Sequence, residues 1–172
     1  DICMHITPLD ASRRIYFIEG NIGCGKSTLL RSFSDDDNFY IVQEPVDDWL
    51  HLLGFVQAGQ LDPAIFQFVV LMSICTTLLE ALQHSPPTST LIVERSIESN
   101  YHVFAKSTFH DSLTASAAYD LARSYANRIL PSNIDAHYIY LRAPPSTCLD
   151  RANSRGRAEE SQLPLSYLQL LH

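Results

Sequence analysis

The stretch Gly20-Asn21-Ile22-Gly23-Cys24-Gly25-Lys26-Ser27-Thr28 decides the fold, because it is a complete G-x-x-x-x-G-K-[ST] loop. An apolar run at residues 15–18 predicts a strand before it, and residues 28–33 predict a helix after it. In that context the glycines turn backbone N–H groups inward around an anion, at the positive end of the helix. Lys26 is expected to reach the β- and γ-phosphates, and Ser27 to offer its hydroxyl to Mg²⁺. The loop therefore predicts binding of a nucleoside triphosphate, and a chance Gly-rich turn is the poorer interpretation.

Strands and helices are expected to alternate along the whole chain. The expected strands are Arg14–Glu19, Phe39–Gln43, Thr90–Glu94 and Ala136–Leu141. The expected helices are Thr28–Phe33, Val46–Gln57, Pro63–His84, Ile97–Lys106, Leu113–Leu130, Pro145–Ser154 and Leu165–His172. Near-continuous apolar strands between long helices predict an α/β fold with a central parallel sheet and helices on both faces. We expect a single domain over residues 1–172, with residues 1–13 as an irregular leader.

Composition narrows the class of protein. The 172 residues include 46% hydrophobic and 18% charged side chains, which suits one soluble domain with a full core. The net charge of −7 argues against binding to nucleic acid, which needs a basic face. The four cysteines lack the spacing of a zinc site or a disulfide framework. We therefore expect reduced thiols and a cytoplasmic location.

The longest apolar segment runs from Pro63 to Leu79, between Asp62 and Glu80, with Gln67 as its clearest polar break. About 17 residues are at the short limit for crossing a bilayer. Helical length without Gly or an inner Pro instead predicts a buried helix, partly covered by a second subunit. Membrane insertion is the poorer interpretation.

Polar side chains follow the expected strands at the edge where ligands of parallel sheets bind. Glu44 follows the second strand, and Glu94-Arg95 ends the third. Phosphoryl transfer needs a metal, positive charge over the transferred group and a base near the acceptor hydroxyl. Glu44 is the candidate base, and Glu94 joins Ser27 as a candidate for the metal. Taken singly, Glu44 also fits a solvated loop carboxylate, and Glu94-Arg95 a structural ion pair.

Positive charge is concentrated near the end of the chain. Arg151, Arg155 and Arg157 lie within seven residues, with Gly156 between the last two. The glycine suggests a mobile, arginine-rich lid that closes over phosphates and excludes water. The alternative is a solvated helix face.

Taken in order, these motifs resemble the deoxynucleoside kinases of the deoxycytidine, deoxyguanosine and mitochondrial thymidine kinase type, including insect and viral relatives. The resemblance covers residues 15–172. It rests on the loop from Glu19 to Thr28, Glu44-Pro45-Val46 with Trp49, Phe66-Gln67, Glu94-Arg95-Ser96, Arg151-x₃-Arg155-Gly156-Arg157-x-Glu159-Glu160 and Pro164-Leu165-Ser166-Tyr167-Leu168. The combination is far more specific than the phosphate loop alone, and it implies a P-loop kinase fold.

The resemblance implies a role for each matching residue. In catalysis, Glu44 would be the general base on the sugar 5′-hydroxyl and Arg95 would steady it, with Lys26, Arg155 and Arg157 on the phosphates. ATP would be the donor, held by Gly20, Asn21, Ile22, Gly23, Cys24, Gly25, Lys26, Ser27, Thr28, Arg151 and Arg155. Mg²⁺ would be held by Ser27 and Glu94. The deoxynucleoside would be contacted by Gln67 at the base edge, Phe104 on the base face, Glu160 at the 3′-hydroxyl, and Ile18, Trp49 and Phe66 around the pocket.

Some positions depart from the family pattern. A tyrosine expected eleven residues before Gln67 is replaced by Val56, or by Gln57 with a one-residue shift. The charged pair of the deoxycytidine and deoxyguanosine kinases corresponds here to Ile74 and Asn100. Without that pair, and with Val70 leaving room for a thymine methyl, the resemblance favours pyrimidine deoxynucleosides, thymidine and deoxycytidine.

The resemblance also concerns the rest of the molecule. It implies a last strand and an adenine-binding loop beyond residue 172, and a homodimer joined through a helix bundle that includes residues 63–82. A nucleoside monophosphate kinase of the thymidylate type is the alternative enzyme. It would need positive charge for a substrate phosphate, whereas Glu44, Trp49 and Gln67 suit an uncharged nucleoside. The alternative that is not an enzyme is a module that binds nucleotides without turnover.

Overall fold

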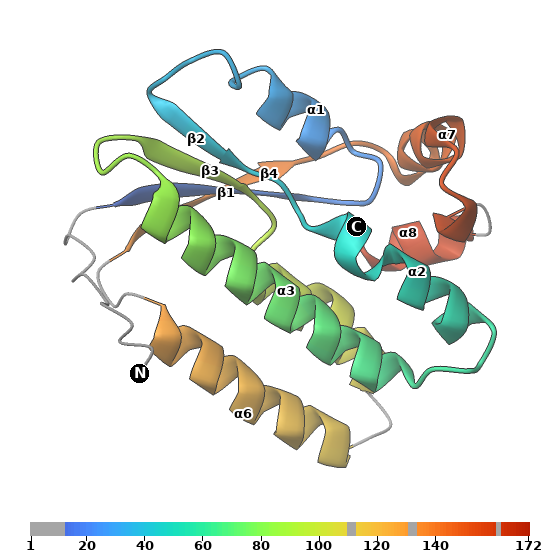
Figure 1. Ribbon diagram of the computed structural model, residues 1–172. Helices are drawn as coiled ribbons and strands as arrows, with labels where there is room; N and C mark the ends of the chain where they lie inside the picture. The colour runs from blue at the N-terminus through green and yellow to red at the C-terminus, as the bar shows by residue number, and fades with distance from the viewer. Residues whose placement is uncertain (1–12, 110–112, 131–133, 161–162) are drawn as a thin grey trace.

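The computed structural model describes residues 13–109, 113–130, 134–160 and 163–172 (Figure 1). The expected leader therefore lies outside the described residues, except for Arg13. The centre is a four-stranded parallel sheet in the order β2-β3-β1-β4. Its strands are β1 (Arg14–Gly20), β2 (Phe39–Val42), β3 (Thr90–Glu94) and β4 (Asp135–Leu141). The expected parallel α/β fold is confirmed.

Alternating side chains of the central strands pack on opposite layers of helices, as the period of two in a strand requires. Ile15 and Phe17 of β1 pack with the end of α3 (Pro63–His84), below the sheet in Figure 1. Ile18 faces the other side, against Leu30 of α1 (Lys26–Arg31). Helices thus cover both faces of the sheet at its central strands, whereas the edge strand β4 is exposed over most of its length.

The helix α3 is the core of the lower layer. Asp62 caps its first turn by accepting a hydrogen bond from the Ala64 backbone N–H at 2.7 Å, and Pro63 begins it. It packs against α2 (Val46–Gln57) and α6 (Leu113–Ile129), the latter lying alongside it in Figure 1. By length and composition α3 could cross a membrane, but half of its most apolar window is buried inside the fold. This burial supports the interpretation of α3 as a core helix.

The expected single helix over residues 97–106 differs from the structure. The chain forms α4 (Ile97–Ser99), a π-helix η1 (Asn100–Ala105) and α5 (Lys106–Phe109). Apolar periodicity does not distinguish a π turn from an α turn over so few residues, so the sequence did not predict it. π turns are rare and occur frequently at functional sites.

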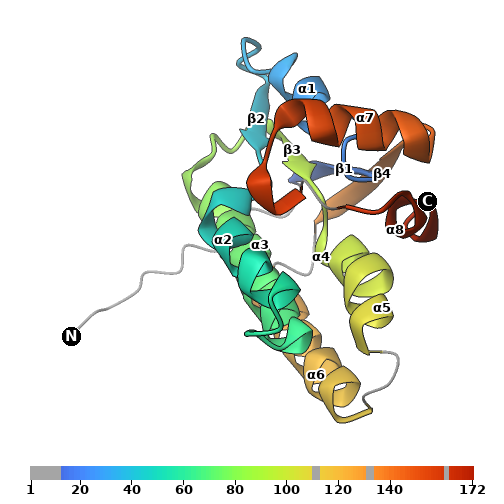
Figure 2. The same ribbon diagram turned by 90° about the vertical axis from the view of Figure 1, so that its right-hand side faces the viewer.

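The last described elements follow β4 in the chain. They are α7 (Pro145–Arg155), the 3₁₀ turn η2 (Ala158–Glu160) and α8 (Leu165–Leu170). α7 ends where Gly156 adopts φ 75°, a left-handed conformation typical of a helix end. Figure 2 shows α7 across from α2, with the carboxyl ends of the strands between them.

Candidate active site

A cavity of about 1430 Å³ opens at the carboxyl ends of the strands. Pockets for single small ligands are typically about 300–1,000 Å³. The cavity is bounded by the phosphate loop, the ends of β2 and β3, α2, α3 and η1, and the segment from α7 to α8. It therefore has room for a nucleotide and a second small molecule together.

The phosphate loop needs its glycines. Gly20 and Gly23 have φ of 146° and 75°, and an added Cβ would lie 2.4 Å from Leu141 O and 2.2 Å from Cys148 O respectively. Gly25 is the N-cap of α1, which begins at Lys26, two residues earlier than expected. Lys26 is only 5% exposed, and its Nζ donates a hydrogen bond to Asn21 O at 3.0 Å. Burial, together with the neighbouring Arg95, lowers the pKa of Lys26.

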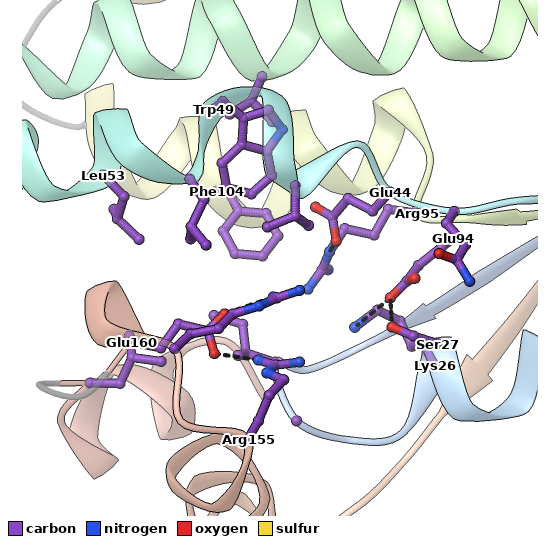
Figure 3. A pocket seen from close by; sticks show the side chains of 18 of the residues that line it. Lys26, Ser27, Glu44, Trp49, Leu53, Glu94, Arg95, Phe104, Arg155 and Glu160 are labelled. Carbon is purple, nitrogen blue, oxygen red and sulfur yellow. Dashed lines mark hydrogen bonds and ion pairs between the residues drawn. The ribbon is translucent and has the colours of Figure 1, made fainter.

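Ser27 and Glu94 meet beside the loop. The Ser27 hydroxyl donates to Glu94 Oε1 at 2.9 Å, and Lys26 Nζ lies 3.9 Å from the same oxygen (Figure 3). Within the described part of the chain there is no group of three or more acidic, histidine or cysteine side chains that could hold a metal. Mg²⁺ is commonly bound by one or two protein oxygens with water and substrate phosphates completing the shell. The hydroxyl and the carboxylate fit that kind of site.

Glu44 and Arg95 form a buried ion pair at the ends of β2 and β3. Arg95 Nε donates to Glu44 Oε2 at 3.0 Å, and Arg95 Nη1 donates to Gly20 O at 3.2 Å. Although burial acts in the opposite direction, Glu44 and Glu19 raise the pKa of Arg95. The pair therefore fixes the Glu44 carboxylate beside the phosphate loop.

The backbone of Arg95 is strained. Its φ of 65° makes it the one non-glycine residue with positive φ in the described ranges. Such conformations cost of order 1–3 kcal/mol and persist where surrounding contacts enforce them. Here the Arg95 N–H donates to Ile18 O at 3.1 Å, and the guanidinium lies 4.7 Å from the centre of the Phe104 ring. In this backbone conformation the Arg95 side chain points toward Glu44 and the cavity.

The wall opposite the loop is largely apolar. Trp49 and Phe66 meet edge to face, with ring centres 5.6 Å apart. Figure 3 shows Trp49 and Phe104 projecting into the same space as Glu44. The cavity wall also includes Val56, Gln67, Val70, Ile74 and Asn100. An apolar pocket with a few polar groups suits an uncharged aromatic ligand.

The arginine-rich segment lies across the cavity mouth. Arg151 Nη1 donates to Cys24 O at 3.0 Å, which joins α7 to the loop. Arg155 and Arg157 both donate to Glu160, the latter at 3.1 Å. Gln57 Nε2 donates to Glu159 O at 2.7 Å, which joins this segment to α2. The three arginines thus reach one cavity, and Glu160, only 8% exposed, is held between two of them.

Three residues expected in the site have side chains that point away from the cavity. The Ile18 side chain packs between Leu30 and Ile92 in the core, because it lies on the strand face away from the cavity. Asn21 Nδ2 donates to Leu168 O at 2.7 Å. The Cys24 side chain packs with Cys148 and Leu168. These last two side chains fix the loop to α7 and α8 and do not line the cavity.

The sequence interpretation missed several contributors. Leu53, Thr108, Leu163 and Tyr167 also line the cavity. Tyr167 stood in a motif that carried the family resemblance, which is the signal that could have identified it. Glu19 accepts hydrogen bonds from the Ser96 N–H at 3.0 Å and the Ser96 hydroxyl at 2.6 Å. Its carboxylate also acts on Arg95, and it directly precedes the phosphate loop.

The parallel sheet and the loop at the end of β1 define a P-loop nucleotide-binding protein. The family model described as deoxynucleoside kinase matches residues 16–172. The chain belongs to the deoxynucleoside kinase family.

Curated relatives agree with that assignment. The chain is 28% identical to mitochondrial thymidine kinase 2 of Homo sapiens over 165 residues, covering 93% of this chain and 62% of that protein. It is 32% identical to the thymidine kinase of Ictalurid herpesvirus 1 over 175 residues, covering 92% and 71%. It is 28% identical to the deoxycytidine kinase of Mus musculus over 186 residues, covering 90% and 71%. The chain thus spans about 62% of the length of the human relative.

Proposed function

We propose that the protein containing this chain transfers the γ-phosphate of ATP to the 5′-hydroxyl of a pyrimidine deoxynucleoside, thymidine or deoxycytidine, for nucleotide salvage. The observation that carries the proposal is the ion pair of Glu44 and Arg95, 3.0 Å apart, in the same cavity as Lys26. It supplies a fixed carboxylate beside a phosphate-binding loop. The relatives named thymidine kinase and deoxycytidine kinase support the choice of acceptor.

In this reaction Glu44 accepts the proton of the 5′-hydroxyl as the hydroxyl oxygen attacks the γ-phosphorus of ATP. The bond between the γ-phosphorus and the β–γ bridging oxygen breaks, and ADP leaves. Arg95 keeps the carboxylate in place and adds positive charge on that side. Lys26 and the lid arginines Arg155 and Arg157 stabilise charge on the transferred group. Mg²⁺, held through Ser27 and Glu94, would neutralise charge on the donor phosphates.

The apolar wall favours a pyrimidine nucleoside. Phe104 offers a ring face for stacking, and Gln67 offers an amide to the base edge. Ile74 and Asn100 bring no charge to that end of the cavity, and Val70 is a small side chain there. Glu160 is the proposed partner of the 3′-hydroxyl, and binding there requires a rearrangement of its contacts with Arg155 and Arg157.

We also propose that the protein is a homodimer in the cytoplasm, with no role for a membrane or nucleic acid. Exposed apolar side chains of α3 and α6 support the dimer. The location is supported by Cys24, Cys75 and Cys148, which are buried free thiols and suit a reducing compartment.

The test replaces the proposed base while keeping its shape. For Glu44→Gln we expect kcat for thymidine and deoxycytidine to fall by about 10²–10⁴-fold, with nucleoside and ATP binding retained. Asp48→Asn is the matched control. Asp48 is exposed in the first turn of α2, close in sequence to Glu44, and its replacement should leave kcat unchanged. Thymidine monophosphate is assayed in parallel. Phosphorylation of the monophosphate alone would contradict the proposal, and so would full activity of Glu44→Gln.

A further inference from the structure

Three polar side chains from three different helices form a hydrogen-bonded series behind the cavity. The Tyr119 hydroxyl of α6 donates to Asn100 Oδ1 of η1, and Asn100 Nδ2 donates to Gln67 Oε1 of α3 at 3.3 Å. Tyr119 and Asn100 are 0% and 2% exposed, and Gln67 is 8% exposed. Asn100 and Gln67 line the cavity, whereas Tyr119 lies behind them. The series therefore leads from the protein core to the Gln67 amide in the cavity wall.

The core fixes the position of the Tyr119 hydroxyl. Its ring stacks on Tyr101 at 5.9 Å and packs against Phe68 at 5.3 Å and Phe109 at 5.2 Å. Burial raises the pKa of Tyr119, so the hydroxyl keeps its proton across the physiological range. Within the described residues, its hydrogen-bond partner is Asn100 Oδ1, and a buried hydroxyl that loses its acceptor is unfavourable. The phenol therefore acts as the donor.

Because the Tyr119 hydroxyl is the donor, it determines which atom donates and which accepts in each following hydrogen bond. Because the Asn100 oxygen faces Tyr119, its nitrogen faces Gln67. Because the Asn100 nitrogen is a donor, the Gln67 oxygen faces Asn100, and the Gln67 Nε2 group points away from it. One lone pair of Gln67 Oε1 is used, while both N–H groups of Nε2 remain for a ligand. The side-chain amide is thus held in one of its two orientations.

The orientation of this amide decides which base edge it can read. A 4-oxopyrimidine presents a donor at N3 and an acceptor at O4, whereas a 4-aminopyrimidine presents an acceptor at N3 and a donor at N4. The two patterns are reversed, so an amide that is free to turn pairs with both. An amide held in one orientation leaves unpaired polar groups with one of them, and such mismatches carry strong discrimination.

We infer that Tyr119 is a positioning residue which, through Asn100, holds the Gln67 amide in one orientation and so makes this chain discriminate between 4-oxo and 4-amino pyrimidine nucleosides. This inference rests on the proposed function, because it assigns Gln67 to the base edge. It adds a specificity determinant on α6, outside the cavity wall, to the residues already placed in the site.

The test measures kcat/KM for thymidine and deoxycytidine, with the Kd of each nucleoside by calorimetry. We expect the wild-type chain to prefer one nucleoside by about tenfold or more, and Tyr119→Phe to bring the ratio closer to one by about three- to tenfold. The change should lie in KM and Kd for the nucleosides, with KM for ATP unchanged. Tyr101→Phe is the matched control, since its hydroxyl bonds Asp120 and its ring belongs to the same cluster. It should leave the ratio as in the wild type.

Asn100→Ala provides the second arm of a double-mutant cycle. If Tyr119 acts through Asn100, the double variant should show the same ratio as Asn100→Ala alone, because the effects are not additive. Additive effects, an unchanged ratio in Tyr119→Phe, or equal use of both nucleosides by the wild type would each overturn the inference. If nucleosides bind without being phosphorylated, the proposed kinase activity fails while the Kd ratios still decide the inference. Binding of neither nucleoside overturns both.

Discussion

Glu94 ends β3 and accepts a hydrogen bond from Ser27 at 2.9 Å, while Lys26 lies 3.9 Å away. The carboxylate therefore balances the loop lysine and can also orient a metal ligand. For Glu94→Gln, which keeps the shape but removes the charge, we expect the apparent affinity for Mg²⁺ to fall by about 10–100-fold. The measurement is phosphorylation rate against Mg²⁺ concentration at fixed ATP.

The control for this experiment is Glu80→Gln, at an exposed position of α3 far along the chain from the loop. It should reproduce the wild-type Mg²⁺ dependence. Binding of ATP without Mg²⁺ should survive Glu94→Gln, since Lys26 and the loop N–H groups remain. An unchanged Mg²⁺ curve in Glu94→Gln would remove this carboxylate from the metal site.

The sequence predicted the positions of some site residues but not the contacts of others. The phosphate-loop glycines, Lys26 and Ser27 are determined by local geometry, so a short motif was enough. Asn21 and Cys24 belong to the same motif, but their side chains turn toward α8 and α7, which a loop pattern does not encode. The contact of Tyr119 with Asn100 spans 19 residues across two helices, and no periodic pattern indicates it.

Among the elements, the two glycines Gly156 and Gly54 should respond to alanine in opposite ways. Gly156 ends α7 with φ 75°, so Gly156→Ala forces a left-handed alanine at the lid and should lower the free energy of unfolding by about 1–2 kcal/mol. The same strain displaces Arg155 and Arg157, so KM for ATP should rise. Gly54 lies inside α2 with no atom within 4 Å of an added Cβ, and Gly54→Ala should stabilise by about 0.5–1 kcal/mol.

Thermal unfolding and steady-state kinetics of the two variants check this pair of expectations. Tm changes of the same sign in the two variants would contradict the expected strain of a left-handed alanine at residue 156. A lower Tm with an unchanged KM for ATP would separate the stability of α7 from the position of its arginines.

The sequence predicted the order and type of most helices and strands. Each end of the four described strands lies within one residue of its expected position. Apolar strands that alternate with long helices are compatible with few fold classes, chiefly a parallel sheet covered by helices. The π-helix was missed because its wider turn depends on tertiary contacts: Asn100 bonds Gln67, and Phe104 lies under Arg95. The pairing of Glu160 with two lid arginines was also missed, since charge spacing does not say which opposite charges meet.

For the molecule as a whole, the exposed apolar side chains of α3 and α6 are the clearest unexplained surface. Ile65 and Met72 lie seven residues apart on α3 and are 54% and 59% exposed. Leu121, Tyr125 and Ile129 repeat every four residues on α6 and are 55%, 54% and 60% exposed. Those spacings place each set on one helix face, and the two helices lie side by side in Figure 1.

This surface is where we expect two copies of the protein to meet. A stable dimer buries about 1,200–2,000 Å² in total, which two adjacent helices from each copy can supply. Met72→Glu places a charge in the centre of the proposed contact, and we expect sedimentation to show a shift from dimer to monomer. Because Met72 is exposed in the single chain, the fold of the monomer should be retained. Leu170→Glu, at a 69% exposed position on α8, should stay dimeric. A monomeric wild type, or a dimer that tolerates Met72→Glu, would contradict this interface.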